Sequence, residues 1–249
     1  MLSGARESAD EPALCTRLPG TVAAGQQLES DQRALIAAAQ GTGTAQAVIW
    51  ESAPALVVGR MDCRLPQFSR AAHAMANAGW PVTVRETGGS AVALVPAMLN
   101  LSVIVPWRAR RPSLARGFGL LCEPIIACLQ EYGIAAVTGA ARGSFCDGRY
   151  NVLVGGRKIA GTAQRRVEHR GGGALLAQAT LLVAPDLELI TRVVSAFYAE
   201  GGGGSTLPSV ASITSLQQHV SGSGPLLVSQ CAEVLVQAVD QALVAASSE

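Results

Sequence analysis

The pair Gly155-Gly156 is the feature that most constrains the fold of this chain. It separates two runs rich in apolar residues, Asn151–Val154 and Arg157–Ala160. Consecutive glycines between such runs predict a two-residue β-hairpin turn, because both central positions of that turn need a positive φ. The pairing then places residue 154 opposite 157 and Lys158 opposite Leu153. The sequence therefore predicts an antiparallel strand pair with a defined register.

This register assigns the side chains of the hairpin to the two faces of a sheet. Lys158 is expected to share its face with polar or small residues, which are Arg149, Asn151, Ala160 and Thr162. The other face carries Val152, Val154 and Ile159 and is expected to contact the core. The lysine then stands on a face that suits the floor of a pocket.

Lys158 is the only lysine among 19 cationic side chains, and all the others are arginine. A lysine retained in such a chain suggests a role that guanidinium cannot fill, such as placing a compact ammonium on one oxygen. Cys146 is a candidate nucleophile whose thiolate the ammonium would stabilise. The two can meet only if a turn at Asp147-Gly148 folds the chain back over the hairpin. Otherwise Cys146 would be a small buried hydrophobe and Lys158 a surface charge.

The rest of the chain alternates strand and helix patterns. It predicts an α/β fold with a mixed, largely antiparallel sheet flanked by helices. Residues 1–26 are expected to form a flexible arm and residues 27–249 a single domain. Helices are predicted at 31–40, after Pro66, at 113–132, at 186–199 and at 229–246. Strands are predicted at 47–50, 55–58, 81–85, 91–95, 99–105, 134–138, 149–154, 157–163 and 174–183.

Composition argues against several classes of partner and site. A formal net charge of +1 without a basic run, and an aromatic content of 4%, give little to bind nucleic acid. We expect no membrane span and no secretory leader, hence a cytoplasmic protein whose six cysteines are reduced. The three histidines are scattered and no CxxC pair is present, so no metal site is expected.

Two motifs stand out along the chain. The first is Arg85-x-x-Gly88-Gly89-x-Ala91-Val92, followed by Leu99-Asn100-x-Ser102. The second is Tyr150-Asn-Val-x-Val-x-Gly-x-Lys158-Ile-x-Gly161-x-Ala-Gln164. Together they resemble the lipoate–protein ligase and octanoyltransferase superfamily, which includes the biotin/lipoate A/B protein ligase catalytic domains. Within the superfamily, Gly143-x-Phe145-Cys146-x-Gly148-x-Tyr150 is similar to the cysteine-dependent octanoyl-[glycine cleavage H protein]:protein octanoyltransferases. The resemblance spans roughly residues 45–200.

The resemblance implies a biotin/lipoate ligase-like catalytic domain with a buried channel for a medium-length acyl chain. It implies transfer of an octanoyl or lipoyl group to the lysine of lipoyl-domain proteins in lipoate assembly. Cys146 would accept the acyl group, and Lys158 would bind its carbonyl. The residues implied to bind the substrate are Arg85, Gly88, Gly89, Asn100, Tyr150, Gly161 and Gln164.

The implied partners are lipoyl-domain proteins, namely the glycine cleavage H protein and dihydrolipoyl acyltransferase subunits. An octanoyl or lipoyl donor is also implied, and acyl carrier protein is one candidate. No cofactor is expected for this reaction. Two features depart from the family: Ala93–Pro96 stands where many relatives carry a histidine or acidic residue, and Asn151 stands where aspartate is usual.

Two other functions remain open on the sequence. One is an ATP-dependent lipoate–protein ligase that acts through a lipoyl-adenylate and needs ATP and magnesium. The other is a non-catalytic protein that binds acyl groups or lipoyl domains.

Overall fold

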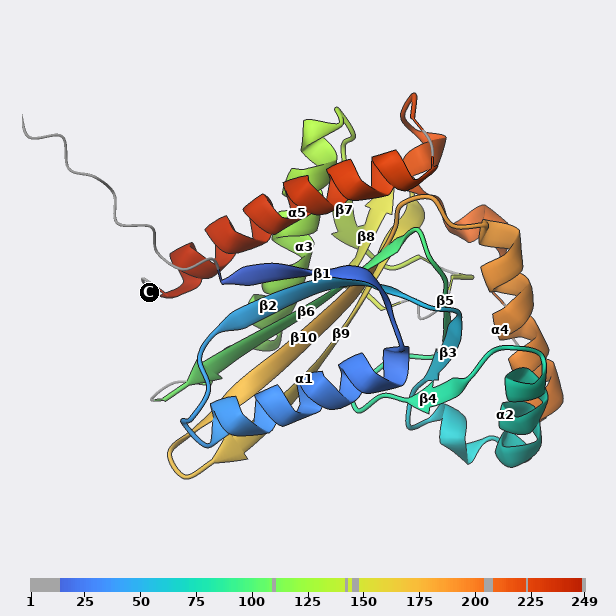
Figure 1. The fold of residues 1–249 in the computed structure, drawn as a ribbon, viewed down its shortest axis with the longest axis horizontal. Coiled ribbons are helices and arrows are strands. Elements are labelled where there is room, and N and C mark those ends of the chain that lie inside the picture. The colour runs from blue at the N-terminus through green and yellow to red at the C-terminus, as the bar shows by residue number, and fades with distance from the viewer. Residues whose placement is uncertain are drawn as a thin grey trace, which may run out of the picture.

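Two β-sheets form the framework of the computed structural model, which describes residues 14–108, 111–141, 143–144, 148–203, 208–222 and 224–247. The strands are β1 (Cys15–Val22), β2 (Gln46–Ser52), β3 (Ala55–Val58), β4 (Val82–Val84), β5 (Val92–Leu94), β6 (Met98–Trp107), β7 (Val137–Gly139), β8 (Asn151–Val154), β9 (Arg157–His169) and β10 (Gly172–Leu182). Seven form one sheet in the order β1-β2-β6-β10-β9-β8-β7, and β4-β3-β5 form a smaller one (Figure 1). In the larger sheet all neighbours except β1 and β2 are antiparallel, which confirms the predicted fold class.

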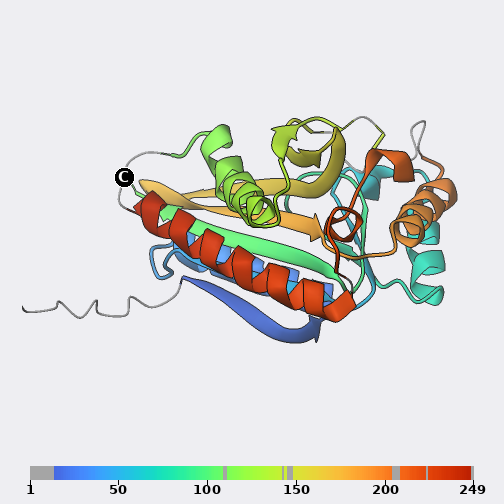
Figure 2. The ribbon, with the colours of Figure 1, turned by 90° about the horizontal axis from the view of Figure 1, so that it is seen from above.

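Five α-helices surround the sheets: α1 (Ala24–Ala39), α2 (Phe68–Asn77), α3 (Leu114–Glu131), α4 (Leu187–Gly201) and α5 (Gly224–Ser247). Helices α3 and α5 lie side by side on one face of the large sheet, and α1 lies on the other (Figures 1 and 2). Helices α2 and α4 pack on each other beside the small sheet. The predicted helices are thus confirmed, and α1 and α5 begin earlier than expected.

The face under α3 and α5 holds the largest core cluster. Along α3, Leu121, Ile125 and Leu129 are fully buried, as their spacing of four residues predicts. Ser113 caps this helix by accepting a hydrogen bond from the Arg116 amide at 3.1 Å. Within the described part of the chain, one helix segment (Gly224–Ala246) is long and apolar enough to cross a membrane, and its inner side belongs to this core.

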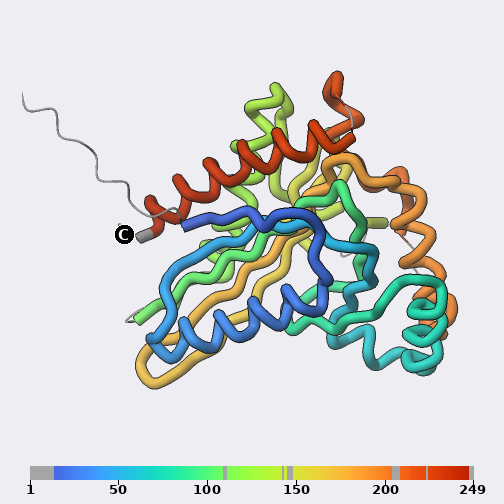
Figure 3. The backbone as a smooth tube through the Cα atoms, viewed as in Figure 1, coloured from blue at the N-terminus to red at the C-terminus, as the bar shows by residue number. Residues whose placement is uncertain are grey.

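The prediction of a flexible arm over residues 1–26 is wrong for the part that the structure describes. Cys15–Val22 is a strand at the edge of the large sheet. Parallel neighbours need a crossover connection, and α1 provides it between β1 and β2 (Figure 3). The Pro19-Gly20 dipeptide, at which the pairing with β2 shifts register, conceals this strand in the sequence. Residues 1–13 lie outside the described residues.

The β8–β9 hairpin has the predicted turn and the predicted register at its tip. Gly155 and Gly156 both have positive φ, of 57° and 78°, and Leu153 pairs with Lys158. The register then shifts, because Val152 pairs with Ala160 and leaves Ile159 as an extra residue. Ala160 therefore packs in the core with Val152, and its predicted place beside Lys158 is wrong.

Candidate functional site

A cavity lies between the large and small sheets, with about 860 Å³ of atom-free space including its mouth. Residues from β2, β6, β9 and β10 line it on one side, and residues from β3, β5, α1, α4 and the loop after Arg85 line it on the others. Most of its wall is apolar: Leu28, Trp50, Val57, Val92, Leu94, Met98, Leu182, Ile190 and Ile213. Such a wall suits a hydrocarbon chain, with a few polar groups to fix its orientation.

Lys158 lines this cavity and is only 6% exposed. Its carbonyl accepts a hydrogen bond from the Thr214 amide at 2.9 Å, so the chain at Ile213 runs beside it. A Cβ atom on Gly161 would lie 2.9 Å from both Cε and Nζ of Lys158. Glycine at 161 therefore makes room for the lysine side chain, which is brought over it by the extra residue in β9.

The diglycine loop, residues Glu86–Ala91, forms another wall of the cavity. The Arg85 guanidinium donates to backbone carbonyls on both sides of Gly89: to Gly88 at 3.0 Å and to Ser90 at 2.6 Å. It also donates to the Val57 carbonyl at 3.3 Å. These bonds tie the loop to the small sheet, so Arg85 shapes the cavity through the backbone.

A buried carboxylate holds the far end of this loop. Asp62 accepts hydrogen bonds from the Gly59 amide at 2.8 Å and the Tyr198 hydroxyl at 2.9 Å. The same hydroxyl accepts from the Ala91 amide at 3.0 Å. Burial, above all, raises the pKa of Tyr198 to about 12, so the phenol remains a donor to Asp62.

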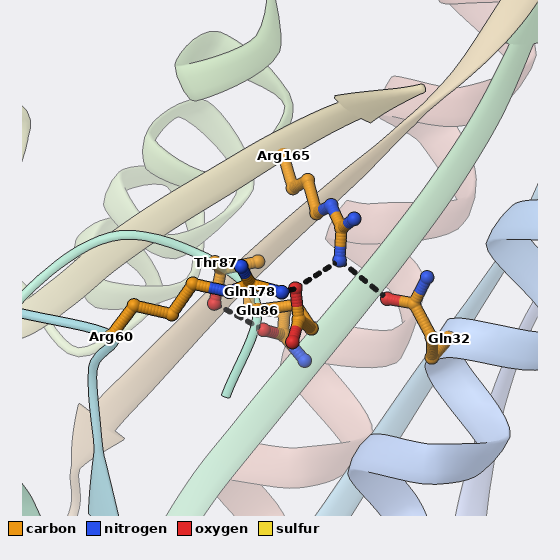
Figure 4. Close-up of polar contacts among 6 residues, drawn as sticks. All are labelled: Gln32, Arg60, Glu86, Thr87, Arg165 and Gln178. Atoms are coloured by element: carbon orange, nitrogen blue, oxygen red, sulfur yellow. Dashed lines mark hydrogen bonds and ion pairs between the residues drawn. The ribbon is translucent and has the colours of Figure 1, made fainter. Parts of the chain in front are cut away.

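The near end of the loop is held from the large sheet. Thr87 donates to Gln178 of β10 at 2.8 Å. Glu86 accepts from Arg165 of β9 at 2.6 Å and also from Arg60, and Arg165 donates to Gln32 of α1 at 3.2 Å (Figure 4). Both ends of the diglycine loop are thereby fixed before any ligand binds.

A straight row of paired residues crosses the cavity floor. Gly161 pairs with Thr180, Thr180 with Asn100, and Asn100 with Trp50. The Thr180 hydroxyl donates to Asn100 Oδ1 at 2.8 Å, and Asn100 Nδ2 donates to the Trp50 carbonyl at 3.3 Å. The row leads from the lysine to the Trp50 indole, whose N–H has no hydrogen-bond partner among the described residues.

The structure brings six of the predicted site residues together at the cavity: Arg85, Gly88, Gly89, Asn100, Lys158 and Gly161. Tyr150 and Gln164 do not line it. The Tyr150 ring stacks on Phe118 of α3 at a centroid distance of 4.2 Å. Gln164 donates to the Leu114 carbonyl at 2.9 Å, because three positions beyond Gly161 a strand residue faces the opposite side. Cys146 lies outside the described residues.

Sequence reasoning missed several residues that line the cavity, namely Trp50, Thr87, Ser102, Gln178 and Ile213. Thr87 and Ser102 lie within the first sequence motif. Their place in that motif was the one signal that could have identified them as cavity residues. The other three lie on strands or loops whose partners are distant in the sequence.

The five described cysteines lie away from the cavity lining. Burial raises the pKa of Cys15 to about 12 and that of Cys122 to about 11. The pKa of Cys231 is raised by its contact with Cys128, whose sulfur is 3.8 Å away, and by burial. Such thiols are poor nucleophiles. Within the described residues no group of three or more His, Cys, Asp or Glu is placed to hold a metal ion.

The two sheets enclose a mostly apolar cavity that a buried lysine and a glycine-rich loop line. The chain belongs to the lipoyl protein ligase A/B catalytic domain family, whose profile matches residues 24–245. This confirms the resemblance read from the two motifs.

Named relatives agree with this assignment, and a solved structure agrees with the fold. An octanoyl-[GcvH]:protein N-octanoyltransferase of Kyrpidia tusciae is 36% identical over 71% of this chain and 62% of its own length. The chain thus matches less than two thirds of that relative. An enzyme of the same name from Exiguobacterium sibiricum is 30% identical over 87% of this chain and 78% of its own length. A lipoate-protein ligase A bound with ATP has the same fold, with a TM-score of 0.67 and 18% identity over 91% of this chain and 84% of the other.

Proposed function

We propose that this protein transfers an octanoyl or lipoyl group to the lysine of lipoyl-domain proteins through an acyl-enzyme on Cys146. The observation that carries this proposal is the chain's one lysine, buried where an apolar cavity meets a preformed glycine loop. The printed name of the relatives supports an octanoyl group that is carried by the glycine cleavage H protein as donor and is passed to the lysine of another protein. A cytoplasmic location belongs to the same proposal.

The residues on both sides of Cys146 support a role for its thiol. Before it, the Gly143 carbonyl accepts from Ser212 Oγ at 2.7 Å, next to Ile213, which bridges to Lys158. After it, the Gly148 carbonyl accepts from Asn151 Nδ2 at 2.7 Å and from the Asn151 amide at 3.3 Å. The second of these bonds closes a turn. Both flanks are therefore anchored to neighbours of the lysine.

The reaction proceeds in two balanced steps. The Cys146 thiolate attacks the acyl carbonyl, and the ammonium of Lys158 stabilises the oxyanion of the tetrahedral intermediate. The bond to the donor then breaks, and the leaving group takes up the proton that the thiol released. In the second step the ε-amine of the acceptor lysine attacks the thioester. The carbon–sulfur bond breaks and the amine's proton returns to the thiolate. No ATP or metal is consumed.

The direct test is the intact mass of the protein after incubation with an octanoyl donor and an acid quench. We expect one octanoyl adduct that maps to Cys146 and is removed by hydroxylamine, as a thioester is. A protein that stays unmodified but releases pyrophosphate from ATP and lipoate is a ligase. Tight octanoate binding without transfer from any donor identifies a non-catalytic binding protein.

The cavity length sets an expectation for acyl-chain preference. Three strand spacings of about 4.8 Å place Trp50 about 14 Å from Gly161 across the sheet. An extended eight-carbon acyl chain, with bonds of about 1.5 Å in a zigzag, spans about 9 Å. From a carbonyl at Lys158 it therefore covers most of this distance and points its methyl end toward the indole.

Trp50→Ala is therefore expected to shift preference toward longer acyl chains. The ratio of kcat/KM for dodecanoyl over octanoyl donors should rise at least about tenfold, because each methylene bound in an apolar pocket is worth a factor of that order. The matched control is Trp107→Ala on the same sheet, away from the cavity lining. An unchanged ratio in Trp50→Ala would contradict the placement of the chain end.

A further inference from the structure

A second buried carboxylate touches the cavity lining without a part in the proposed chemistry. Asp31 of α1 is 3% exposed, and it accepts three hydrogen bonds. Gln27 Nε2 donates to Oδ1 at 2.7 Å, while Ser102 Oγ and Gln178 Nε2 donate to Oδ2 at 2.5 and 2.7 Å. Of these three donors, Ser102 and Gln178 line the cavity and Gln27 does not.

These bonds fix the direction of the hydrogen bonds that run from Asp31 through Gln178 to Thr87 of the diglycine loop. Burial raises the pKa of Asp31, and the hydrogen bonds from Ser102, Gln27 and Gln178 lower it. The Gln178 amide turns its NH2 toward Asp31 and its oxygen toward the loop. That oxygen accepts the single hydrogen of the Thr87 hydroxyl at 2.8 Å. The hydroxyl of Ser102 is likewise committed to Asp31. Thr87 and Ser102 can then offer only lone pairs to a ligand in the cavity.

We propose that Asp31 is a positioning residue for acyl transfer, which acts through Gln178 to fix the Thr87 hydroxyl and the start of the diglycine loop. The inference rests on the proposed function, because it concerns the same cavity. Asp31 touches no reacting atom. Its effect reaches the acyl group because Thr87 precedes Gly88 and Gly89, whose backbone forms the cavity wall. A small displacement of that wall is costly, since catalysis depends on near-attack geometry.

A double-mutant cycle between Asp31 and Thr87 tests the relay. Asp31→Leu and Thr87→Val are each expected to lower kcat/KM about tenfold or more, mainly through kcat. If both act through one path, Asp31→Leu in the Thr87→Val background should cost less than about twofold more. Thr87→Ser, which keeps the hydroxyl, should retain activity within about threefold. Equal losses from Asp31→Leu in both backgrounds would overturn the proposal.

Gln27→Leu is the matched control, because it also removes one hydrogen bond from Asp31 but lies away from the cavity lining. It should lower the urea midpoint and leave kcat/KM unchanged. Should Asp31→Leu not fold, Gln178→Leu decides, since it cuts the relay and leaves Asp31 in place. A loss of kcat/KM equal to that of Thr87→Val supports the relay, and no loss refutes it.

A readout without turnover separates this proposal from the proposed function. Amide hydrogen exchange over residues 85–91 should become at least about tenfold faster in Asp31→Leu, or in Gln178→Leu, and stay unchanged in Gln27→Leu. If the wild type transfers no acyl group under any donor, the proposed function fails and the exchange result alone judges the positioning role. Unchanged exchange in the first two variants would refute it.

Discussion

Replacing Lys158 by methionine is expected to lower kcat/KM for octanoyl transfer by about 10²- to 10³-fold, the usual cost of removing one donor to a developing oxyanion. Methionine fills the space of the buried lysine stem without its charge, so the loss should fall mainly on kcat. Lys158→Arg should not restore activity, because Gly161 leaves room for the lysine side chain alone and guanidinium is larger and planar. Single-turnover formation of the acyl-enzyme is the measurement.

Arg157→Met is the matched control for Lys158. Arg157 is the preceding residue on β9, faces the other side of the strand and contacts Gln218 at 3.4 Å. The Arg157→Met variant loses the same charge without a change at the cavity. Its kcat/KM should therefore stay within about twofold of the wild-type value. If both variants lose activity equally, general electrostatic attraction of the partner explains the effect, and the role of Lys158 at the carbonyl is refuted.

Substituting Cys146 by alanine is expected to have the larger effect, a loss of at least about 10⁴-fold in kcat. Removal of a covalent nucleophile costs this much or more where the rest of the site remains intact. The variant should also lack the hydroxylamine-labile adduct, which mass spectrometry checks directly. Octanoate affinity should be nearly unchanged, because the apolar wall of the cavity is untouched.

Cys63→Ala provides the control for Cys146. Cys63 is a partly buried thiol that approaches the Gly59 carbonyl at 3.6 Å and does not line the cavity. It should keep full activity and form the adduct. Full turnover by Cys146→Ala would remove the acyl-enzyme from the mechanism. Pyrophosphate release in that case would redirect the assignment to an adenylate-forming ligase.

Much of the fold could be predicted because its signals are local. The Gly155-Gly156 turn specified a hairpin and its register, and the spacing of Leu121, Ile125 and Leu129 specified α3. The strand β1 was missed because an edge strand with Pro19-Gly20 in it lacks the alternation of a buried strand. The extra residue at Ile159 was missed because a bulge is set by pairing with another strand, which the sequence does not display.

The site residues also divide into those that local motifs predicted and those that depend on pairing between distant segments. Arg85, Gly88, Gly89 and Lys158 stand in short motifs, and the structure places all four at the cavity. The resemblance implied that Gln164 lies beside the cavity, but this residue faces α3. The sequence did not show the extra residue in β9 that decides which side chains after it face the cavity. Asp31 could not be found because a single acidic residue in an amphipathic helix has the pattern of a solvated side chain. Its partners come from β6 and β10, far along the chain.

The position of α1 has a consequence for how the protein can be shortened. This helix precedes both sequence motifs, yet it connects β1 to β2, brings Leu28 to the cavity and brings Asp31 to Ser102 of the cavity lining. A fragment that begins at residue 45 would contain every residue of both motifs, but it would lack one wall of the cavity. The smallest piece of this chain worth expressing for activity therefore starts upstream of Cys15, well before the first recognisable signature.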